Sequence, residues 1–122
     1  MSDRAKRVAR MISERDLLDA VVECACALGW LVHHDRPGMD RRGRWRTAIQ
    51  GHPGFPDLVL VRPPRVLLVE LKAERGDLTE WQNEWVVALA ACPGVEVYVW
   101  WPNDWMSGEI ERVLAATAPP SG

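Results

Sequence analysis

The chain has no apolar run that approaches the roughly 20 residues of a membrane-spanning helix. Its first residues, MSDRAKRVARMISERD, also lack the apolar core of about 7–15 residues that a secretory signal peptide needs. These two absences exclude the obvious routes into or across a membrane. We therefore expect a cytoplasmic protein without a membrane partner.

Cysteine is scarce, with three in the whole chain. Cys24 and Cys26 lie two residues apart on a predicted helix and so point in different directions, while Cys92 stands alone. These spacings exclude a zinc site, and three cysteines cannot all form disulfides. We expect all three to be reduced and mostly buried, because free cysteine packs as a small hydrophobic residue.

An excess of positive charge is also absent: the formal net charge is −2, which by itself argues against a nucleic-acid partner. The distribution argues differently. Residues 1–46 hold ten Lys and Arg against seven Asp and Glu, whereas residues 47–122 hold five against ten. Within the basic half, one long polar loop over residues 35–53 carries Arg36, Arg41, Arg42, Arg44 and Arg46. Such a basic cluster could contact phosphates, and the alternative is a solvated flexible loop.

What remains is an ordinary composition, with 122 residues, 48% apolar and 26% charged, which predicts one soluble globular domain. We expect a basic leader at 1–12, the domain at 13–117 and a disordered tail at 118–122. Hydrophobic periodicity predicts one central mixed sheet flanked by helices, an α/β fold. The expected order is a helix at 13–28, strands at 30–34, 56–61 and 66–72, a helix from about 79 that stops at Pro93-Gly94, a strand at 95–101, and a short helix at 103–114.

The most informative stretch is residues 54–73, GFPDLVLVRPPRVLLVELKA. Asp57 opens the first of its two apolar runs, and Glu70 and Lys72 close the second. Residues two apart share a face of a strand, so Glu70 and Lys72 point to the same side. If the two strands form a hairpin around Pro63-Pro64, the start of one lies beside the end of the other. All three charges then collect at one edge of the sheet.

Two carboxylates this close repel each other unless a proton or a cation neutralises them. Carboxylate oxygens, with a main-chain carbonyl such as that of Leu71, suit Mg²⁺ or Mn²⁺. Such an ion can activate water and stabilise charge on a phosphate, and Lys72 adds a positive charge. The alternative is a solvated pair of Lys72 and Glu70 at a strand end.

Two further polar residues lie on apolar helix faces. Glu14 falls within the apolar stripe of the first helix, where it could approach the cluster, whereas Glu23 lies on the opposite, solvated face. The alternative for Glu14 is a carboxylate favoured by the helix dipole. Gln82 shares a face with Trp85, but it also fits a capping box that begins at Thr79. Both interpretations of Gln82 stay open.

Seven tryptophans are present. We expect Trp30, Trp85 and Trp100 to lie in the core. Trp45, among the loop arginines, and Trp101 or Trp105 could instead stack on bases.

Pro56-Asp57 followed by Glu70-Leu71-Lys72 is the Pro-Asp…Glu-x-Lys signature of the PD-(D/E)xK nuclease superfamily. The wider pattern, with ERDLLDAVVECACALGWLVHH, GFPDLVLV, VELKAERGDLTEWQNEW and VYVWWPNDW, resembles the VRR-NUC family. The resemblance covers about residues 13–114 and is strongest to the small stand-alone members from phages and prophages.

This resemblance implies a restriction-endonuclease-like fold in which Asp57 and Glu70 bind the metal and Lys72 is the catalytic lysine. Glu14 would match the acid of the family's first helix, and Gln82 the glutamine after the lysine motif. Members commonly carry a glutamine four residues after that acid, where this chain has Leu18.

The implied activity is that of a Mg²⁺- or Mn²⁺-dependent endodeoxyribonuclease. Its small relatives resemble structure-selective nucleases that act on branched DNA such as four-way (Holliday) junctions. A chain with one site would cut two strands as a homodimer. The alternative is a non-catalytic DNA-binding accessory protein with a nuclease fold.

Overall fold

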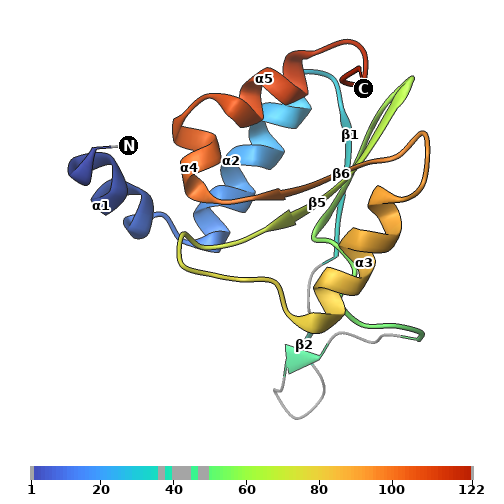
Figure 1. The fold of residues 1–122 in the computed structure, drawn as a ribbon, viewed down its shortest axis with the longest axis horizontal. Helices are drawn as coiled ribbons and strands as arrows, with labels where there is room; N and C mark the ends of the chain where they lie inside the picture. Colours follow the sequence, from blue (N-terminus) through green and yellow to red (C-terminus); the bar gives the residue numbers. More distant parts are fainter. Residues whose placement is uncertain (1, 36–37, 40–44, 47–49, 122) are drawn as a thin grey trace.

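A computed structural model describes residues 2–35, 38–39, 45–46 and 50–121. Its centre is a four-stranded sheet with the order β1-β4-β5-β6 (Figure 1). β1 pairs with β4 and β4 with β5 in antiparallel fashion, and β5 pairs with β6 in parallel. The sheet is therefore mixed, as the sequence predicts. The strands are β1 (Leu31–His34), β4 (Leu58–Arg62), β5 (Arg65–Leu71) and β6 (Glu96–Trp100).

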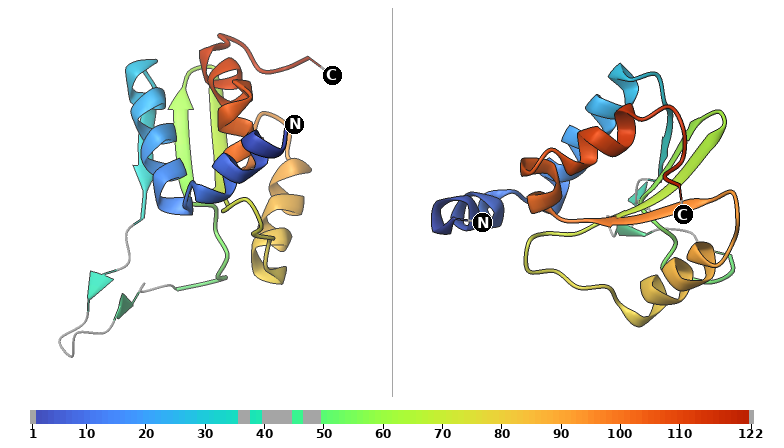
Figure 2. Two further views of the ribbon diagram at one scale, coloured as in Figure 1. Left: turned by 90° about the vertical axis from the view of Figure 1, so that its left-hand side faces the viewer. Right: turned by 45° about the horizontal axis from the view of Figure 1, so that its top comes forward.

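Helices cover both faces of this sheet (Figure 2). α2 (Glu14–Ala27), α4 (Pro102–Met106) and α5 (Glu109–Ala115) lie on one face, and α3 (Glu80–Ala90) lies on the other. α3 is the crossover that parallel pairing of β5 and β6 requires. The core lies between the sheet and the first group of helices, and its buried residues include Leu17, Val21, Leu58, Leu60, Leu67, Val69, Ile110 and Leu114.

Local sequence signals determine where the two longer helices begin. Ser13 and Asp16 form a reciprocal capping box at the start of α2, and Thr79 and Gln82 form another at the start of α3. Each box satisfies two backbone N–H groups that a helix start leaves without a partner. Gly29 follows α2 with φ of +87°, the left-handed conformation in which helices commonly end.

A buried arginine holds together the end of the sheet where β5 begins. The Arg65 guanidinium makes two hydrogen bonds to the Glu96 carboxylate, at 2.7 and 2.9 Å, and donates to the carbonyl oxygens of Val113 and Ala116. It also lies over the ring of Trp30. Burial alone would raise the pKa of Glu96, but the hydrogen bonds from Arg65 and Tyr98 outweigh it and lower that pKa. The buried charge of Arg65 is therefore paired with the carboxylate of Glu96.

Several expectations need correction. The predicted terminal helix is two helices, because Gly108 adopts φ of +83° between α4 and α5. The cysteines are free as expected, but Cys26 and Cys92 are exposed and Cys24 is half-buried, so the prediction that they are mostly buried was wrong. Trp30 and Trp100 are buried, whereas Trp85 is only half-buried.

Two segments read from the sequence as a leader and a loop contain regular structure. α1 (Asp3–Met11) is a helix that precedes α2. Within the 35–53 loop, β2 (Gly38–Met39) and β3 (Trp45–Arg46) form a two-stranded antiparallel ribbon. Across the described part of the chain, no helix is long and apolar enough to cross a membrane.

Candidate active site

Three carboxylates gather where β4 begins and β5 ends. Glu14 is the first residue of α2, Asp57 directly precedes β4, and Glu70 is the second-last residue of β5. The hairpin register pairs Leu58 with Val69, which brings Asp57 beside Glu70. One oxygen from each carboxylate lies within 4.8 Å of the other two. The structure thus brings together the three acids that the sequence singled out.

Backbone contacts fix the orientation of Asp57. Its Oδ2 accepts a hydrogen bond of 2.8 Å from the backbone N–H of Leu71, so the main chain of β5 holds the carboxylate that β4 supplies. Leu71 also lines a cavity of about 220 Å³ beside Glu14 and Asp57. This position is compatible with the predicted ligand role of the Leu71 carbonyl, which stays a prediction.

Gln82 connects α3 to the site through both ends of its amide. Its Oε1 accepts from the Lys72 ammonium at 2.6 Å and from the backbone N–H of Thr79 at 3.0 Å. Its Nε2 donates to Glu70 Oε1 at 3.0 Å. The two interpretations of Gln82 are therefore compatible, because the side chain that caps α3 also forms hydrogen bonds with Lys72 and Glu70. The Nε2 and Oε1 assignment follows from these partners.

Lys72 is almost fully buried, with 8% of its surface exposed. Its Nζ lies 3.9 Å from Glu70 Oε1, longer than a direct hydrogen bond. The ammonium is thus held mainly by Gln82, next to the carboxylates. The interpretation of Lys72 and Glu70 as a solvated pair is wrong, because Glu70 is 1% exposed.

Gly54 allows α3 to approach this closely. Its φ is +91°, and a Cβ at this position would lie 2.5 Å from the backbone carbonyl carbon of Trp81. Any side chain would push the start of α3, and with it Gln82, away from the sheet. The indole N–H of Trp85 reinforces the contact by donating to the carbonyl of Pro53.

The electrostatics of the cluster favour a cation. Burial, the largest cause, and the neighbouring Asp57 carboxylate together raise the pKa of Glu70 to about 8, although Lys72 lowers it by a smaller amount. Partial burial of its carboxylate and the charge of Asp57 also raise the pKa of Glu14. A hard divalent cation would relieve this repulsion, and three carboxylates are the oxygen donors it prefers. The residues present therefore fit a Mg²⁺ or Mn²⁺ ion.

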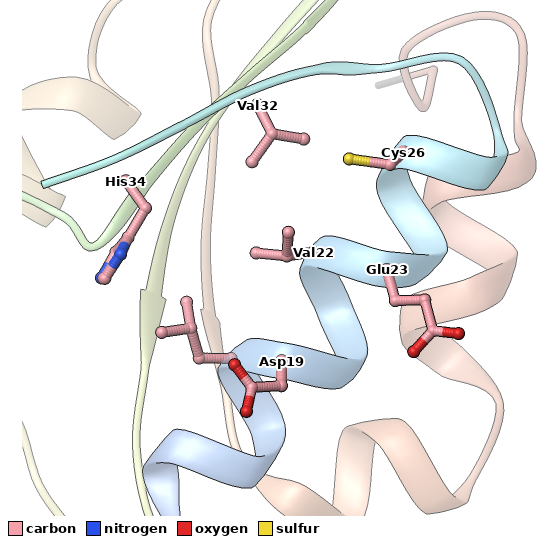
Figure 3. A pocket seen from close by; sticks show the side chains of 7 residues that line it. Asp19, Val22, Glu23, Cys26, Val32 and His34 are labelled. Atoms are coloured by element: carbon pink, nitrogen blue, oxygen red, sulfur yellow. The ribbon is translucent and has the colours of Figure 1, made fainter. Parts of the chain in front are cut away.

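The sequence did not identify two residues that line the 220 Å³ cavity, Arg15 and His34. His34 also belongs to a second cavity, of about 420 Å³, between α2 and β1. Figure 3 shows Val32 and His34 of β1 on one side of it and α2 on the other. The available signal for His34 was its position as the last residue of the first strand, at the same edge as Asp57. α2 contributes Leu18, Asp19, Val22, Glu23 and Cys26 to this second cavity.

The predicted nucleic-acid contacts of the 35–53 loop involve six residues whose side chains lie outside what the structure describes: Arg36, Arg41, Arg42, Arg44, Trp45 and Arg46. Trp101 is half-buried, and its indole N–H donates to the Gly76 carbonyl at 2.8 Å. Trp105 is half-buried and packs against the core. Base stacking by any of the three tryptophans stays a prediction.

The mixed sheet has helices on both faces and carries acids and a lysine at one edge, an α/β fold consistent with a restriction-endonuclease-like domain. The VRR-NUC domain model matches residues 14–100, which is more than half of the chain. The chain therefore belongs to the VRR-NUC family, and its restriction-endonuclease-like fold agrees with that membership. A nuclease-type function that acts on DNA follows from this family. No curated protein and no solved structure matches the chain.

Proposed function

We propose that this protein is a Mg²⁺- or Mn²⁺-dependent endonuclease that hydrolyses phosphodiester bonds in DNA. The observation that carries the proposal is the cluster at the edge of the sheet: three carboxylates within 4.8 Å of one another beside a buried lysine. A purely structural role would not explain the cluster, because Glu70 is buried beside half-buried Asp57 and exposed Glu14, and a buried carboxylate next to like charges destabilises a fold. A functional role explains why the three acids lie together.

Each side chain has a distinct task in this proposal. Asp57, Glu70 and Glu14 would hold the ion, with the Leu71 carbonyl as a further oxygen ligand. Bound there, a divalent cation supplies activation of water and stabilisation of the charge that develops on the phosphate.

The lysine and the glutamine act beside the metal site. Lys72 places a positive charge where the phosphate is attacked, and this electrostatic stabilisation needs an ammonium in a fixed position. Gln82 is a positioning residue, since it holds both Lys72 and Glu70 through hydrogen bonds.

The proposed substrate is branched DNA such as a four-way junction. Symmetric cutting of two strands takes two active sites, so a chain with one site would act as a homodimer. The proposed location is the cytoplasm of a bacterium or a phage-infected cell, in keeping with three free cysteines.

The proposal is tested by cleavage of linear, flapped and four-way DNA with Mg²⁺ or Mn²⁺ and with EDTA. Lys72→Ala is expected to lower the cleavage rate by about 10²–10³-fold while the protein stays folded. Glu14→Gln is expected to lower it strongly, whereas Glu23→Gln, on the same helix but outside the cluster, should cut like wild type. Wild-type protein that cuts none of these DNAs would contradict the proposal.

The second candidate is a non-catalytic DNA-binding accessory protein. It would bind the same DNAs without cutting them, and Lys72→Ala would then change nothing but affinity. The intact set of Asp57, Glu70 and Lys72 favours the enzyme, since a site that no longer turns over has no need to bury these charges together.

A further inference from the structure

The helix α1 carries a concentration of positive charge that the active site leaves unexplained. Within nine residues it holds four cations, Arg4, Lys6, Arg7 and Arg10, against one acid, Asp3. All four cations are exposed. Among the residues that the structure describes, none of the four forms an ion pair with a carboxylate. Their charge is therefore available to a partner.

These cations share one side of the helix. At about 100° per residue, Lys6, Arg10 and Arg7 fall within an arc of about 100°, and Arg4 lies about 60° beyond it. Asp3 falls within the same arc, so the net charge of this side is +3. The buried Ala9, which marks the side facing the rest of the protein, lies away from this arc. α1 thus attaches through a small residue, against α4, and presents a basic stripe outward.

The C-terminal end of α1 lies close to the candidate active site. α1 ends at Met11, and Glu14 of the carboxylate cluster follows three residues later. Three residues of extended chain span at most about 11 Å, so the C-terminal end of the basic helix lies within that distance of Glu14. Figures 1 and 2 show α1 extending beyond the sheet and the other helices from the start of α2. A long polyanion held at the cluster would pass this helix.

We propose that α1 is an arm that binds the DNA backbone beside the phosphate to be cleaved. This inference rests on the proposed function and adds the surface that holds the substrate. Four exposed cations offer contacts to a polyanion, and a helix of nine residues is about 13 Å long, enough to follow roughly four base-pair steps. The net charge of the chain is −2 and α1 contributes +3, so the rest of the chain carries −5, and the arm adds to the positive charge of the 35–53 loop.

The apolar content of α1 argues against the other occupants. Val8 and Met11 are its exposed large hydrophobic residues. Two such side chains bury too little area for a stable dimer interface or for insertion into a lipid surface, both of which need a continuous apolar face. Phosphate recognition needs only the cations.

The test measures how DNA affinity depends on salt, in a Lys72→Ala background so that no cleavage interferes. A variant with glutamine at positions 4, 6, 7 and 10 should bind a fluorescent four-way junction at least tenfold more weakly at 100 mM salt. The slope of log K against log salt should become shallower by about 2–3.6, since each lost phosphate contact removes about 0.9. Glutamine keeps a good helix propensity, so unfolding curves should be unchanged.

A matched pair of single-charge variants removes the effect of net charge. Arg7→Gln should weaken binding and flatten the slope by up to about 0.9, whereas Arg112→Gln, an exposed arginine on α5, should do neither. An unchanged slope in the fourfold variant overturns the inference. The inference is also overturned if the fourfold variant keeps its affinity for DNA but no longer binds anionic vesicles. It is likewise overturned if the only property that the fourfold variant loses is self-association.

The inference and the proposed function fail in different ways. If the wild-type protein cuts DNA but the fourfold variant binds and cuts equally well, the arm is wrong and the nuclease stands. If the fourfold variant loses the salt slope but wild type cuts no DNA, the arm stands and the nuclease is wrong.

Discussion

Replacement of Glu70 by glutamine should stabilise the metal-free protein at high pH. The Glu70 side chain is 1% exposed and faces the carboxylates of Asp57 and Glu14, and its pKa is raised to about 8 from 4.5. This difference of about 3.5 pKa units sets a ceiling of about 5 kcal/mol on the cost of ionising Glu70 in the fold. Glutamine avoids this cost and can still accept the hydrogen bond from Gln82, and the pKa of about 8 already includes the attraction to Lys72. Relaxation around the ionised carboxylate keeps the cost below its ceiling, so the net gain expected at pH 8.5 is about 1–3 kcal/mol.

The gain should depend on pH in a defined direction. Between about pH 4.5 and pH 8 the folded chain retains a proton on Glu70 that the unfolded chain has released, so the wild-type protein loses stability as the pH rises. The slope is at most about 1.4 kcal/mol per pH unit. At pH 5.5 Glu70 is still protonated in the fold and only about one pH unit of this loss has occurred, so the stabilisation by glutamine should be much smaller than at pH 8.5.

The assay is urea unfolding in EDTA at pH 5.5 and 8.5, followed by tryptophan fluorescence. The matched control is Glu96→Gln, on the next strand of the same sheet. Its carboxylate pairs with buried Arg65 and has a lowered pKa, so this change should destabilise the protein by about 2–4 kcal/mol at both pH values. The reasoning is refuted if Glu70→Gln destabilises at pH 8.5, or if its effect is the same at both pH values.

Three further predictions follow from other parts of the structure. Mg²⁺ binding to the metal-free protein should release about one proton at pH 7 and almost none at pH 9, as measured by calorimetry in buffers of different ionisation enthalpy. If no proton is released at pH 7, the raised pKa of Glu70 is contradicted. Gly54→Ala should cost about 2–4 kcal/mol in urea unfolding and reduce cleavage. The control is Gly94→Ala, because Gly94 also has a positive φ but no atom lies within 4 Å of an added Cβ; this change should cost about 1–2 kcal/mol and leave cleavage intact. Equal effects of the two changes would refute the steric argument. Arg65→Lys should cost about 2–3 kcal/mol, because lysine cannot replace two hydrogen bonds to one carboxylate; a cost below about 0.5 kcal/mol would show that this network is not needed.

The carboxylate cluster could be predicted because it depends on local rules. Alternation along a strand places Glu70 and Lys72 on one face, and a tight connection between two strands forces the start of one beside the end of the other. The observed register of Leu58 opposite Val69 follows from these rules. No long-range information was needed to bring Asp57 to Glu70.

The roles of Gln82 and Gly54 depend on tertiary placement. The sequence indicates a capping box at Thr79, but the contact of the same amide with Lys72 requires α3 to lie close against the sheet. Gly54 permits that approach, and its positive φ and the nearby Trp81 backbone exist only in the folded chain. A pattern of spacings along one sequence carries neither fact.

Charge pairing across long distances was equally hidden. Arg65 directly follows the predicted Pro63-Pro64 turn, yet it is buried against Glu96, 31 residues further along the chain. The split between α4 and α5 had a local signal in Gly108, but a glycine within a helical pattern does not by itself specify a positive φ. The exposure of Cys26 and Cys92 likewise depends on which helix faces the sheet covers.

The central claim is that the buried charge of Glu70 is retained for a metal ion that cuts DNA, at a cost in stability. The most direct test compares the rate of DNA cleavage in Mg²⁺ for wild type and Glu70→Gln, using samples whose stability has been measured without metal. The account predicts that Glu70→Gln is at least as stable as wild type at pH 8.5 and cleaves at least about 10²-fold more slowly. Cleavage by Glu70→Gln at the wild-type rate would contradict it.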